Sequence, residues 1–330
     1  MNLQGKTAFV TGATGFLGGA LVHRLIEDGV KVRALARREN RDGYIRDLDG
    51  VEIVMGNLSD AERMKELVAG CDVVFHVAAA TGGAMDKQRE TNVEGTRNVM
   101  NAAAETRIER IIHVSSIAVY GYRVRTDVSE DMPLNPGADP YPITKVEGEN
   151  IVREICKQHD LDYSIIRPGM IHGPRSSYWT RKMFKRVRQK PSFMIGNGKG
   201  AAYPIYVDDV VDLMIVLATH PAAVGEAFNC TPDPSPTMRD YLGGYAALAG
   251  HNSFIGLPVF LLLPAASLLA LFSSKHSTKK DIPDLLSHMQ RYITYRMEKA
   301  DRLLDWRPKV SLEAGIQRSI PYLREKGLLE

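Results

Sequence analysis

The residues best suited to acid–base chemistry are a tyrosine and a lysine four positions apart. Tyr141 and Lys145 lie in the segment YPITK, at the start of a stretch with helical spacing of its apolar residues. Residues four apart share one face of a helix, so the lysine ammonium can stand beside the phenol. A free phenol has a pKa of about 10, and a nearby positive charge lowers it. The spacing therefore predicts Tyr141 as a general acid or base that Lys145 tunes.

A serine precedes this pair at the end of an apolar strand. Ser116 lies in VSSIAVYG, and its hydroxyl can hydrogen-bond a substrate oxygen on which Tyr141 acts. A Tyr-x-x-x-Lys spacing occurs by chance in many chains. Its meaning therefore depends on the other motifs that accompany it.

Three glycines near the start of the chain predict a site for a dinucleotide. The stretch TGATGFLGGALVHRLIEDG places Gly12, Gly15 and Gly18 where an apolar strand passes into a helix. Glycines there permit a tight turn, close approach of a pyrophosphate and packing of the helix on the strand. The first helical turn offers free N–H groups and the positive end of the helix dipole. A tight turn without a ligand is the alternative.

The end of the second strand bears on which dinucleotide binds. A carboxylate there usually binds the 2′-hydroxyl of a ribose. Here the strand ends in Ala36, Arg37 and Arg38, with no carboxylate before Glu39. Two guanidinium groups can bind a 2′-phosphate, so we expect NADP, with NAD as the alternative. Two solvated arginines on a loop would also fit the sequence.

The elements that must position these residues alternate between strand and helix. Their strands are continuously apolar, which is typical of a parallel sheet covered on both faces. We expect an α/β fold, with a Rossmann-type doubly wound parallel sheet over residues 1–175. A smaller C-terminal substrate-binding lobe covers 176–330, and a strand and helix near 203–220 return to the Rossmann domain.

Composition excludes several other classes of protein. A net charge of +3 over 330 residues gives no argument for nucleic-acid binding. Cys71, Cys156 and Cys230 form neither a disulfide framework nor a metal-binding spacing, and no His, Cys and carboxylate cluster suggests a metal. No signal peptide is visible, so we expect a reducing, cytoplasmic setting with contact to a membrane as an open alternative.

Taken together, the motifs resemble those of the extended short-chain dehydrogenase/reductases, the NAD-dependent epimerase/dehydratase superfamily. The matching segments are TGATGFLG, HVAAAT, TNVEGTRNVM, VSSIAVYG, YPITK, IIRPGMIHGP, IYVDDVVDLMIVL and GEAFNC. The resemblance implies that Ser116, Tyr141 and Lys145 are catalytic, and that Lys145 also binds the nicotinamide ribose. It further implies that Asn92 steadies its helix and a proton-relay water.

The turn, the arginines and the resemblance together give a set of expected binding residues. For the cofactor these are Gly12, Thr14, Gly15, Phe16, Leu17, Gly18, Arg37, Arg38, Asn57, Leu58, Ala78, Ala79, Ala80, Lys145, Pro168 and Gly169. For the substrate they are Thr81, Ser116, Ile117, Tyr141 and His172.

Three departures from the family pattern narrow the function. Asn57 replaces the usual aspartate of Gly-Asp-Leu, and its carbonyl can still accept from an adenine amino group. The segment AAYP before YVDD lacks an arginine that nucleotide-sugar enzymes often carry there. Ile117 and Ala118 follow the serine where sugar 4,6-dehydratases have acidic residues. These departures argue against a nucleotide-sugar substrate and against dehydration.

The substrate is expected to be apolar. VKVRALAR and the uncharged run 254–272 resemble the 3β-hydroxysteroid dehydrogenase and dihydroflavonol reductase-like branch. We expect hydride transfer that interconverts a hydroxyl and a carbonyl on a sterol-like or aryl/alkyl ketone. A nucleotide-sugar 4-epimerase with tightly bound NAD is the alternative, and a non-catalytic dinucleotide sensor is a third reading that would need none of the three catalytic residues.

Two surface segments and the oligomeric state leave alternatives open. Residues 254–272 fit a membrane span, an interfacial or substrate-lining helix, or buried core. The basic helix 181–190 fits a solvated face, a membrane-surface patch working with 254–272, or an anion site. Family members often dimerise through two long helices, here 88–105 and 142–158, so we expect a homodimer.

Overall fold

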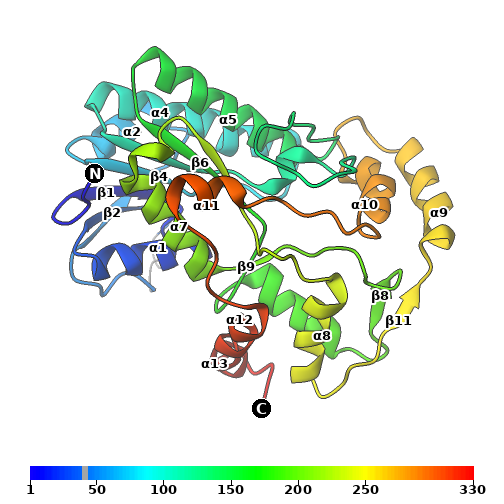
Figure 1. The fold of residues 1–330 in the computed structure, drawn as a ribbon. Coiled ribbons are helices and arrows are strands. Elements are labelled where there is room, and N and C mark those ends of the chain that lie inside the picture. The colour runs from blue at the N-terminus through cyan, green and yellow to red at the C-terminus, as the bar shows by residue number, and fades with distance from the viewer. Residues whose placement is uncertain (39–43) are drawn as a thin grey trace.

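A seven-stranded parallel sheet forms the centre of the molecule in the computed structural model, which describes residues 1–38 and 44–330 (Figure 1). The strands lie in the order β10-β6-β5-β4-β1-β2-β3. Their bounds are β1 Thr7–Thr11, β2 Lys31–Ala36, β3 Val51–Met55, β4 Val73–His76, β5 Arg110–Val114, β6 Tyr163–Pro168 and β10 Ala227–Cys230. Since β1 pairs with both β2 and β4, the strand order reverses there, which is where ligands bind in such sheets. The expected Rossmann-type fold is confirmed.

Helices cover both faces of the sheet, which explains why its inner strands are apolar without alternation (Figure 1). On one face, α1 packs with α7 over a core that Leu21 and Leu213 share. On the other, α2, α4 and α5 pack in sequence over a second core. Their bounds are α1 Phe16–Glu27, α2 Ala61–Val68, α4 Gly95–Thr106, α5 Pro140–Gln158 and α7 Val207–Thr219.

Several elements differ in detail from those that the sequence predicts. The helix expected near 88–105 consists of α3 Met85–Arg89, a π-helical turn Glu90–Glu94 and α4. The segment IIRPGMIH forms two strands, β6 and β7, Met170–His172, and the glycine between them, Gly169, permits close approach of the Tyr203 carbonyl oxygen, which a Cβ would overlap. Asp60 caps α2 by accepting from the Arg63 N–H at 3.0 Å, although the preceding Ser59 is also a residue type that caps helices.

The segment near 203–220 divides between two places. Helix α7 packs on the sheet beside α1, while β9, Pro204–Tyr206, pairs with β7 in a separate two-stranded sheet. The seventh strand of the central sheet is instead β10, which pairs with β6. The motif GEAFNC, noted above only for its resemblance, contains this strand.

The C-terminal lobe contains short helices and one small sheet, β8 with β11. Its helical turns are a π-helical turn Ser177–Lys182 and the 3₁₀ turn Thr278–Asp281. Its other elements are α6 Met183–Arg188, β8 Phe193–Ile195, α8 Met238–Leu248, β11 Ile255–Leu257, α9 Val259–Leu271, α10 Ile282–His288, α11 Glu298–Leu304, α12 Leu312–Arg318 and α13 Ile320–Glu325.

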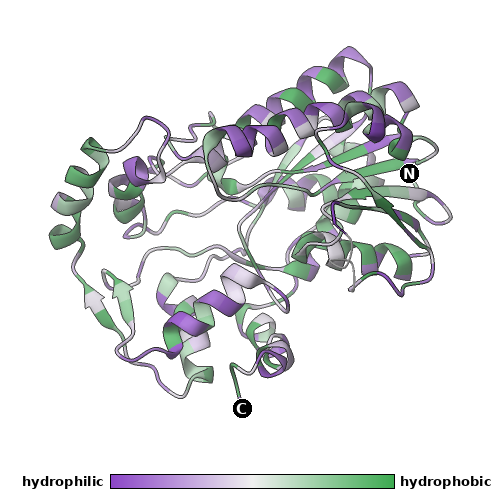
Figure 2. Cartoon of the chain, turned by 180° about the vertical axis from the view of Figure 1, so that it is seen from behind, coloured by the Kyte–Doolittle hydropathy of each residue, from purple (hydrophilic) through white to green (hydrophobic). Residues whose placement is uncertain are grey.

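The uncharged run 254–272 is neither one helix nor buried core. It forms β11 and α9, and α9 is largely coloured as hydrophobic in Figure 2. Of the residues of α9, only Val259 and Ala266 are buried. The buried-core alternative is therefore wrong, because most of the apolar side chains face outward. Within the described residues, no helix has the length and apolar character needed to cross a bilayer.

Candidate active site

The glycine turn lies where β1 ends, at the reversal of strand order. Gly12 has a φ of 69°, and a Cβ there would lie 2.8 Å from the Ala78 backbone nitrogen. A Cβ at Gly18 would overlap the Gly12 carbonyl oxygen, so this glycine lets α1 pack on the turn. Gly15 caps α1 without any side-chain hydrogen bond, which leaves the first helical N–H groups available to an anion.

The segment after β4 is held beside this turn. The Thr11 hydroxyl accepts from the N–H groups of Val77 and Ala78, at 3.1 Å each. Asn92, on the π-helical turn, accepts from the Ala80 N–H at 2.7 Å and donates to the Ala80 carbonyl at 2.9 Å. Residues 78–80 therefore run along one side of the space in front of the glycine turn.

Asn92 also reaches the helix that carries the expected acid or base. Its amide nitrogen donates to the Thr144 hydroxyl at 2.9 Å, and that hydroxyl donates to the Tyr141 carbonyl at 3.0 Å. Asn92 is buried, so these bonds compete little with water. The asparagine thus ties the segment after β4 to the first turn of α5.

Ser116 and Tyr141 are brought together. Ser116 follows β5, Tyr141 is in the first turn of α5, and the serine hydroxyl hydrogen-bonds the phenol. Burial raises the pKa of Tyr141, and this bond opposes the rise. Asp139 caps α5 by accepting from the Tyr141 N–H at 3.0 Å, which fixes where the helix begins.

Lys145 lies one turn further along α5 and is buried. Its Nζ donates to the Val114 carbonyl at 2.6 Å, and burial lowers its pKa to about 8, with Glu149 acting in the opposite direction. Burial is thus the largest cause of the pKa shift of both Tyr141 and Lys145, and in each case it disfavours the charged form. The sequence predicted that a neighbouring ammonium lowers the phenol pKa. In the structure the pKa of Tyr141 is raised instead, and the Lys145 ammonium donates to the backbone at the end of β5.

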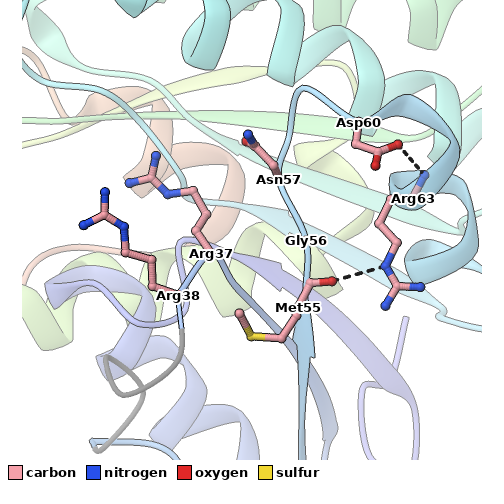
Figure 3. Close-up of a pocket in the computed structure, with 7 residues that line it drawn as sticks. All are labelled: Arg37, Arg38, Met55, Gly56, Asn57, Asp60 and Arg63. Carbon is pink, nitrogen blue, oxygen red and sulfur yellow. Dashed lines mark hydrogen bonds between the residues drawn. The ribbon is translucent and has the colours of Figure 1, made fainter.

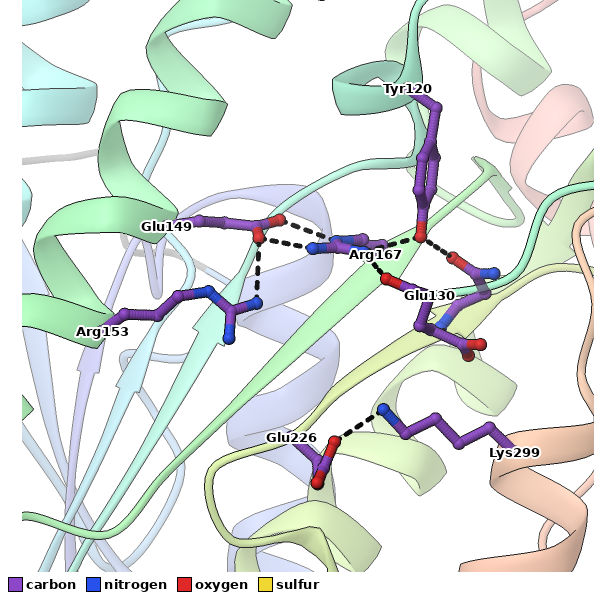
Figure 4. Close-up of polar contacts among 8 residues, drawn as sticks. Tyr120, Glu130, Glu149, Arg153, Arg167, Glu226 and Lys299 are labelled. Carbon is purple, nitrogen blue, oxygen red and sulfur yellow. Dashed lines mark hydrogen bonds and ion pairs between the residues drawn. The ribbon is translucent and has the colours of Figure 1, made fainter. Parts of the chain in front are cut away.

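A buried ion pair joins α5 to the strand β6 (Figure 4). Arg167 of β6 donates to both carboxylate oxygens of Glu149, at 2.9 and 2.7 Å. It also donates to the Tyr120 hydroxyl at 2.6 Å, which in turn donates to Asn229 on β10 at 2.9 Å. The network joins α5, β6, β10 and the turn after Ser116 into one frame.

Sequence reasoning missed this network, although two signals were present. Glu149 lies four residues after Lys145, so it continues the face that carries Tyr141 and Lys145. Arg167 is a lone charge inside the apolar strand SIIRP, and such a charge is almost always paired.

An open pocket of about 580 Å³ lies where β2 and β3 end (Figure 3). Arg37 and Arg38 extend from one side, and Asn57 lies between them and Arg63. The pocket is lined by Arg37, Arg38, Met55, Gly56, Asn57, Asp60 and Arg63. Both expected 2′-phosphate ligands therefore share a pocket with the expected adenine ligand. Glu39 lies outside the described residues.

The other expected cofactor residues fall along the same edge of the sheet. Thr14 is in the glycine turn, and Phe16 and Leu17 begin α1. Leu58 is buried under Gly95, and Pro168 ends β6. A chain of expected contacts thus runs from the pocket at β2 and β3, past the glycine turn, to Ser116 and Tyr141.

The expected substrate residues are less well assembled. Ile117 is buried directly after Ser116, and Thr81 is exposed after Ala80. His172 is buried against Tyr206 and Tyr241, and none of its described contacts is with Ser116 or Tyr141. The structure therefore places His172 inside the C-terminal lobe, apart from the catalytic group.

A second pocket of about 530 Å³ lies between the segment before α5 and the helix α9. Its lining comprises Arg123, Asn135, Gly137, Ala138, Ser267, Ala270, Leu271, Lys280 and Asp281. Asp281 accepts from the N–H groups of Ala138 and Asp139, at 2.8 and 2.7 Å. The C-terminal lobe is thereby fastened two residues before Tyr141. Sequence reasoning did not identify Asp281.

Over residues 1–38 and 44–330, no group of three His, Cys, Asp or Glu side chains is placed to hold a metal ion. The chemistry that the chain's own groups support is proton transfer at the Tyr141 phenol.

Known proteins resemble this chain over most of its length. The NAD dependent epimerase/dehydratase family matches residues 8–231. A ketoreductase of Stigmatella aurantiaca, named for 4-hydroxy-2-methyl-3-oxo-4-farnesyl-3,4-dihydroquinoline-1-oxide, is 30% identical over 93% of this chain and 94% of its own. A UDP-glucose 4-epimerase of Mycolicibacterium smegmatis is 30% identical over 96% and 98%.

A solved structure shows the same fold. The UDP-glucose 4-epimerase of Thermotoga maritima superposes with a TM-score of 0.79 at 22% identity, over 97% of this chain and 99% of that one. The chain therefore belongs to the NAD-dependent epimerase/dehydratase family, and it is an NAD-dependent oxidoreductase or epimerase of the extended short-chain dehydrogenase/reductase type.

Proposed function

We propose that the protein is an NADP-linked oxidoreductase that interconverts a hydroxyl and a carbonyl on an apolar small molecule. The observation that carries this proposal is the hydrogen bond between Ser116 and the Tyr141 phenol, with the buried Lys145 one turn further along α5, at the sheet edge that also carries the glycine turn. The bound nicotinamide would supply or accept the hydride. The chain's own residues would position the substrate and move the proton.

The proton step falls to Tyr141. In the direction of reduction, the phenol donates its proton to the developing alkoxide, while the Ser116 hydroxyl donates a hydrogen bond to the same oxygen. Burial keeps the phenol protonated at neutral pH, because it raises the pKa. A protonated phenol is the form needed for reduction.

The role proposed for Lys145 requires a change of partner. In the chain alone its Nζ donates to the Val114 carbonyl. An ammonium has three N–H donors, so Nζ can keep this bond and donate to a ribose hydroxyl as well. Held there, it would favour the phenolate electrostatically.

Arg37 and Arg38 support the choice of NADP. They lie in one pocket with Asn57, at the carboxyl end of β2, where the ribose 2′ position is expected (Figure 3). Their replacement by serine should raise the KM for NADPH at least about tenfold, since each removes a charged hydrogen bond. The KM for NADH, which lacks the 2′-phosphate, is the internal control and should change little.

The apolar nature of the substrate has its support among the relatives. The Stigmatella ketoreductase is named for a substrate with a farnesyl chain. A polyprenyl or alkyl ketone is therefore the first class of substrate to test.

A nucleotide-sugar 4-epimerase is the second candidate, because the Mycolicibacterium relative matches nearly the whole chain. The two candidates differ in whether the cofactor turns over. Purified protein should oxidise NADPH in proportion to an apolar ketone supplied. Conversion of a UDP-sugar to its epimer with no net change in nicotinamide absorbance would overturn the proposal in favour of the epimerase.

The variant Tyr141→Phe tests the catalytic assignment. Removal of the phenol oxygen should lower kcat at least about 100-fold with little change in KM. Tyr163→Phe is the matched control, because Tyr163 begins β6, at the end of the strand opposite Pro168. Equal activity of the two variants would refute the role of Tyr141.

We also propose that the chain forms a homodimer through α4 and α5. The two helices lie side by side on one face of the sheet (Figure 1), and Asn101 and Glu154 remain exposed on this layer. A second copy of the pair would complete a four-helix bundle. Sedimentation at micromolar concentration should give twice the mass of one chain, and a monomer would contradict the proposal.

A further inference from the structure

One end of the C-terminal lobe presents an exposed apolar surface (Figures 1 and 2). We call it the apolar tip. It consists of Phe193, Ile255, Phe260, Leu261, Leu268, Leu269, Leu271 and Phe272. The most accessible are Phe272, Leu271 and Phe260, which are 81%, 73% and 71% exposed. Phe193 and Ile255 are directly paired across β8 and β11, so the small sheet extends the surface of α9.

The tip gathers most of the exposed large apolar side chains. Of thirteen such side chains in the described residues, the eight of the tip come from residue 193 and the run 255–272. A helix that is apolar on all sides is normally buried in a core or a membrane. Scattered exposed leucines need no explanation, but a continuous cluster indicates a surface that contacts another apolar phase or partner.

Cations border the tip, and carboxylates are absent from its sequence. Lys275 and Lys279 are exposed directly after α9, and Lys280 follows them. No Asp or Glu occurs between Asp240 and Asp281. Residues 241–280 therefore place lysines beside the apolar tip and no carboxylates.

We propose that the apolar tip docks the protein on a membrane surface that contains anionic lipids. The thirteen residues of α9 span about 20 Å, too short to cross a bilayer but suited to lie in its interface. Its apolar side chains would enter the acyl boundary, and the lysines after it would meet the negative headgroups.

A second copy of this chain is the competing occupant, and charge argues against it. A symmetric dimer places the same patch on both sides of the interface. Such a dimer would bring two sets of Lys275, Lys279 and Lys280 to one interface, and residues 241–280 offer no carboxylate to pair with either set. In an anionic bilayer, the headgroups would complement the lysines and the acyl chains would complement the apolar side chains.

The basic helix α6 is separate from this surface in its packing. It buries Phe184 and Val187 against α8 and leaves Lys185 and Arg186 exposed. The proposal assigns docking to the tip and not to α6. The exposed cations of α6 therefore offer a matched control for charge.

Vesicle flotation with the full chain tests the proposal. Wild-type protein should float with vesicles of phosphatidylcholine and phosphatidylglycerol, and at least about fivefold less with phosphatidylcholine alone. The variant with Phe260→Gln, Leu268→Gln and Phe272→Gln should bind at least about 30-fold more weakly, since three exposed apolar side chains no longer enter the lipid. Lys275→Gln with Lys279→Gln should weaken binding at least about fivefold.

The controls separate docking from misfolding and from bulk charge. The apolar variant should keep the wild-type melting temperature and its nicotinamide binding, because its three substitutions are on exposed positions. Lys185→Gln with Arg186→Gln should change vesicle binding less than about threefold. The proposal is overturned if wild-type protein does not float, if the α6 variant loses as much binding as the tip variants, or if the tip substitutions abolish self-association instead of vesicle binding.

Discussion

At the carboxyl edge of the sheet, polar side chains are buried and bonded to one another. At the apolar tip, by contrast, apolar side chains are exposed to solvent. At the edge, Glu149 and Arg167 are almost completely buried and meet in two hydrogen bonds. At the tip, Phe260 and Phe272 are mostly accessible. The first arrangement fixes positions within the fold. The second leaves a surface whose partner lies outside the chain.

Substitutions in the two regions should therefore differ in how much they lower the free energy of unfolding. A buried charge depends on its partner, so removal of the partner is costly. An exposed apolar side chain contributes little to folding in water, because it is accessible in the folded and unfolded states alike. Substitutions in the two regions can therefore test the comparison directly.

The largest effect is expected at the buried ion pair. Arg167→Met should lower the free energy of unfolding by about 3–5 kcal/mol, because Glu149 would remain buried and the half-exposed Arg153 at 3.4 Å would compensate its charge only in part. Urea denaturation of the purified protein measures this. The double variant Arg167→Met with Glu149→Leu should recover at least half of the loss. A double variant as unstable as the single one would show that the pair is not what holds this region.

The next effect concerns the core beneath the glycine turn. Leu21 on α1 is fully buried, and Leu21→Ala should cost about 2–5 kcal/mol of unfolding free energy, from lost burial and the cavity left behind. Chemical denaturation at neutral pH provides the measurement. A cost below about 1 kcal/mol would mean that α1 packs more loosely than its burial indicates.

A smaller effect should depend on pH. The pKa of Lys145 falls to about 8 on folding, so between pH 8 and 9.5 the unfolded chain holds more of this proton. The unfolding free energy therefore gains a contribution that rises with pH, of about 1.5 kcal/mol over that interval. In Lys145→Met this contribution disappears.

The measurement must be a difference between the two proteins. Burial raises the thiol pKa values of Cys71, Cys156 and Cys230, and these groups contribute an opposite slope that is common to both. The unfolding free energy of wild type minus that of Lys145→Met should increase from pH 8 to 9.5. A constant difference would show that Lys145 keeps its ordinary pKa in the folded state.

The smallest effect is expected at the tip. Leu268→Ala removes the same atoms as Leu21→Ala but from a side chain that is 60% exposed. The unfolding free energy in buffer should change by less than about 0.5 kcal/mol. A loss comparable to that of Leu21→Ala would place the tip within the core and end the comparison.

The fold and the order of the site were predictable because they depend on local patterns. Apolar strands, the glycine turn and the helix that begins before Tyr141 each occupy one short segment, and a parallel sheet brings the ends of those segments to one edge. This rule predicts that Ser116, which follows β5, lies at the edge, whereas Tyr141 was assigned to the site from its spacing to Lys145 and from the family resemblance.

The features that were missed depend on contacts between distant segments. Arg167 meets Glu149 across 18 positions, and Asp281 meets Ala138 across 143. The exposure of α9 likewise depends on which distant segments pack against it, and the sequence of α9 alone does not reveal this. His172 ends in a cluster of tyrosines because β7 turns away from the central sheet at Gly169.

Asp281 links the two regions that the comparison sets apart. Its carboxylate accepts from the backbone just before α5, and its own segment follows α9 by ten residues. Because this carboxylate binds the backbone directly before α5, a displacement of α9 relative to the sheet would be transmitted to the first turn of that helix, where Tyr141 lies.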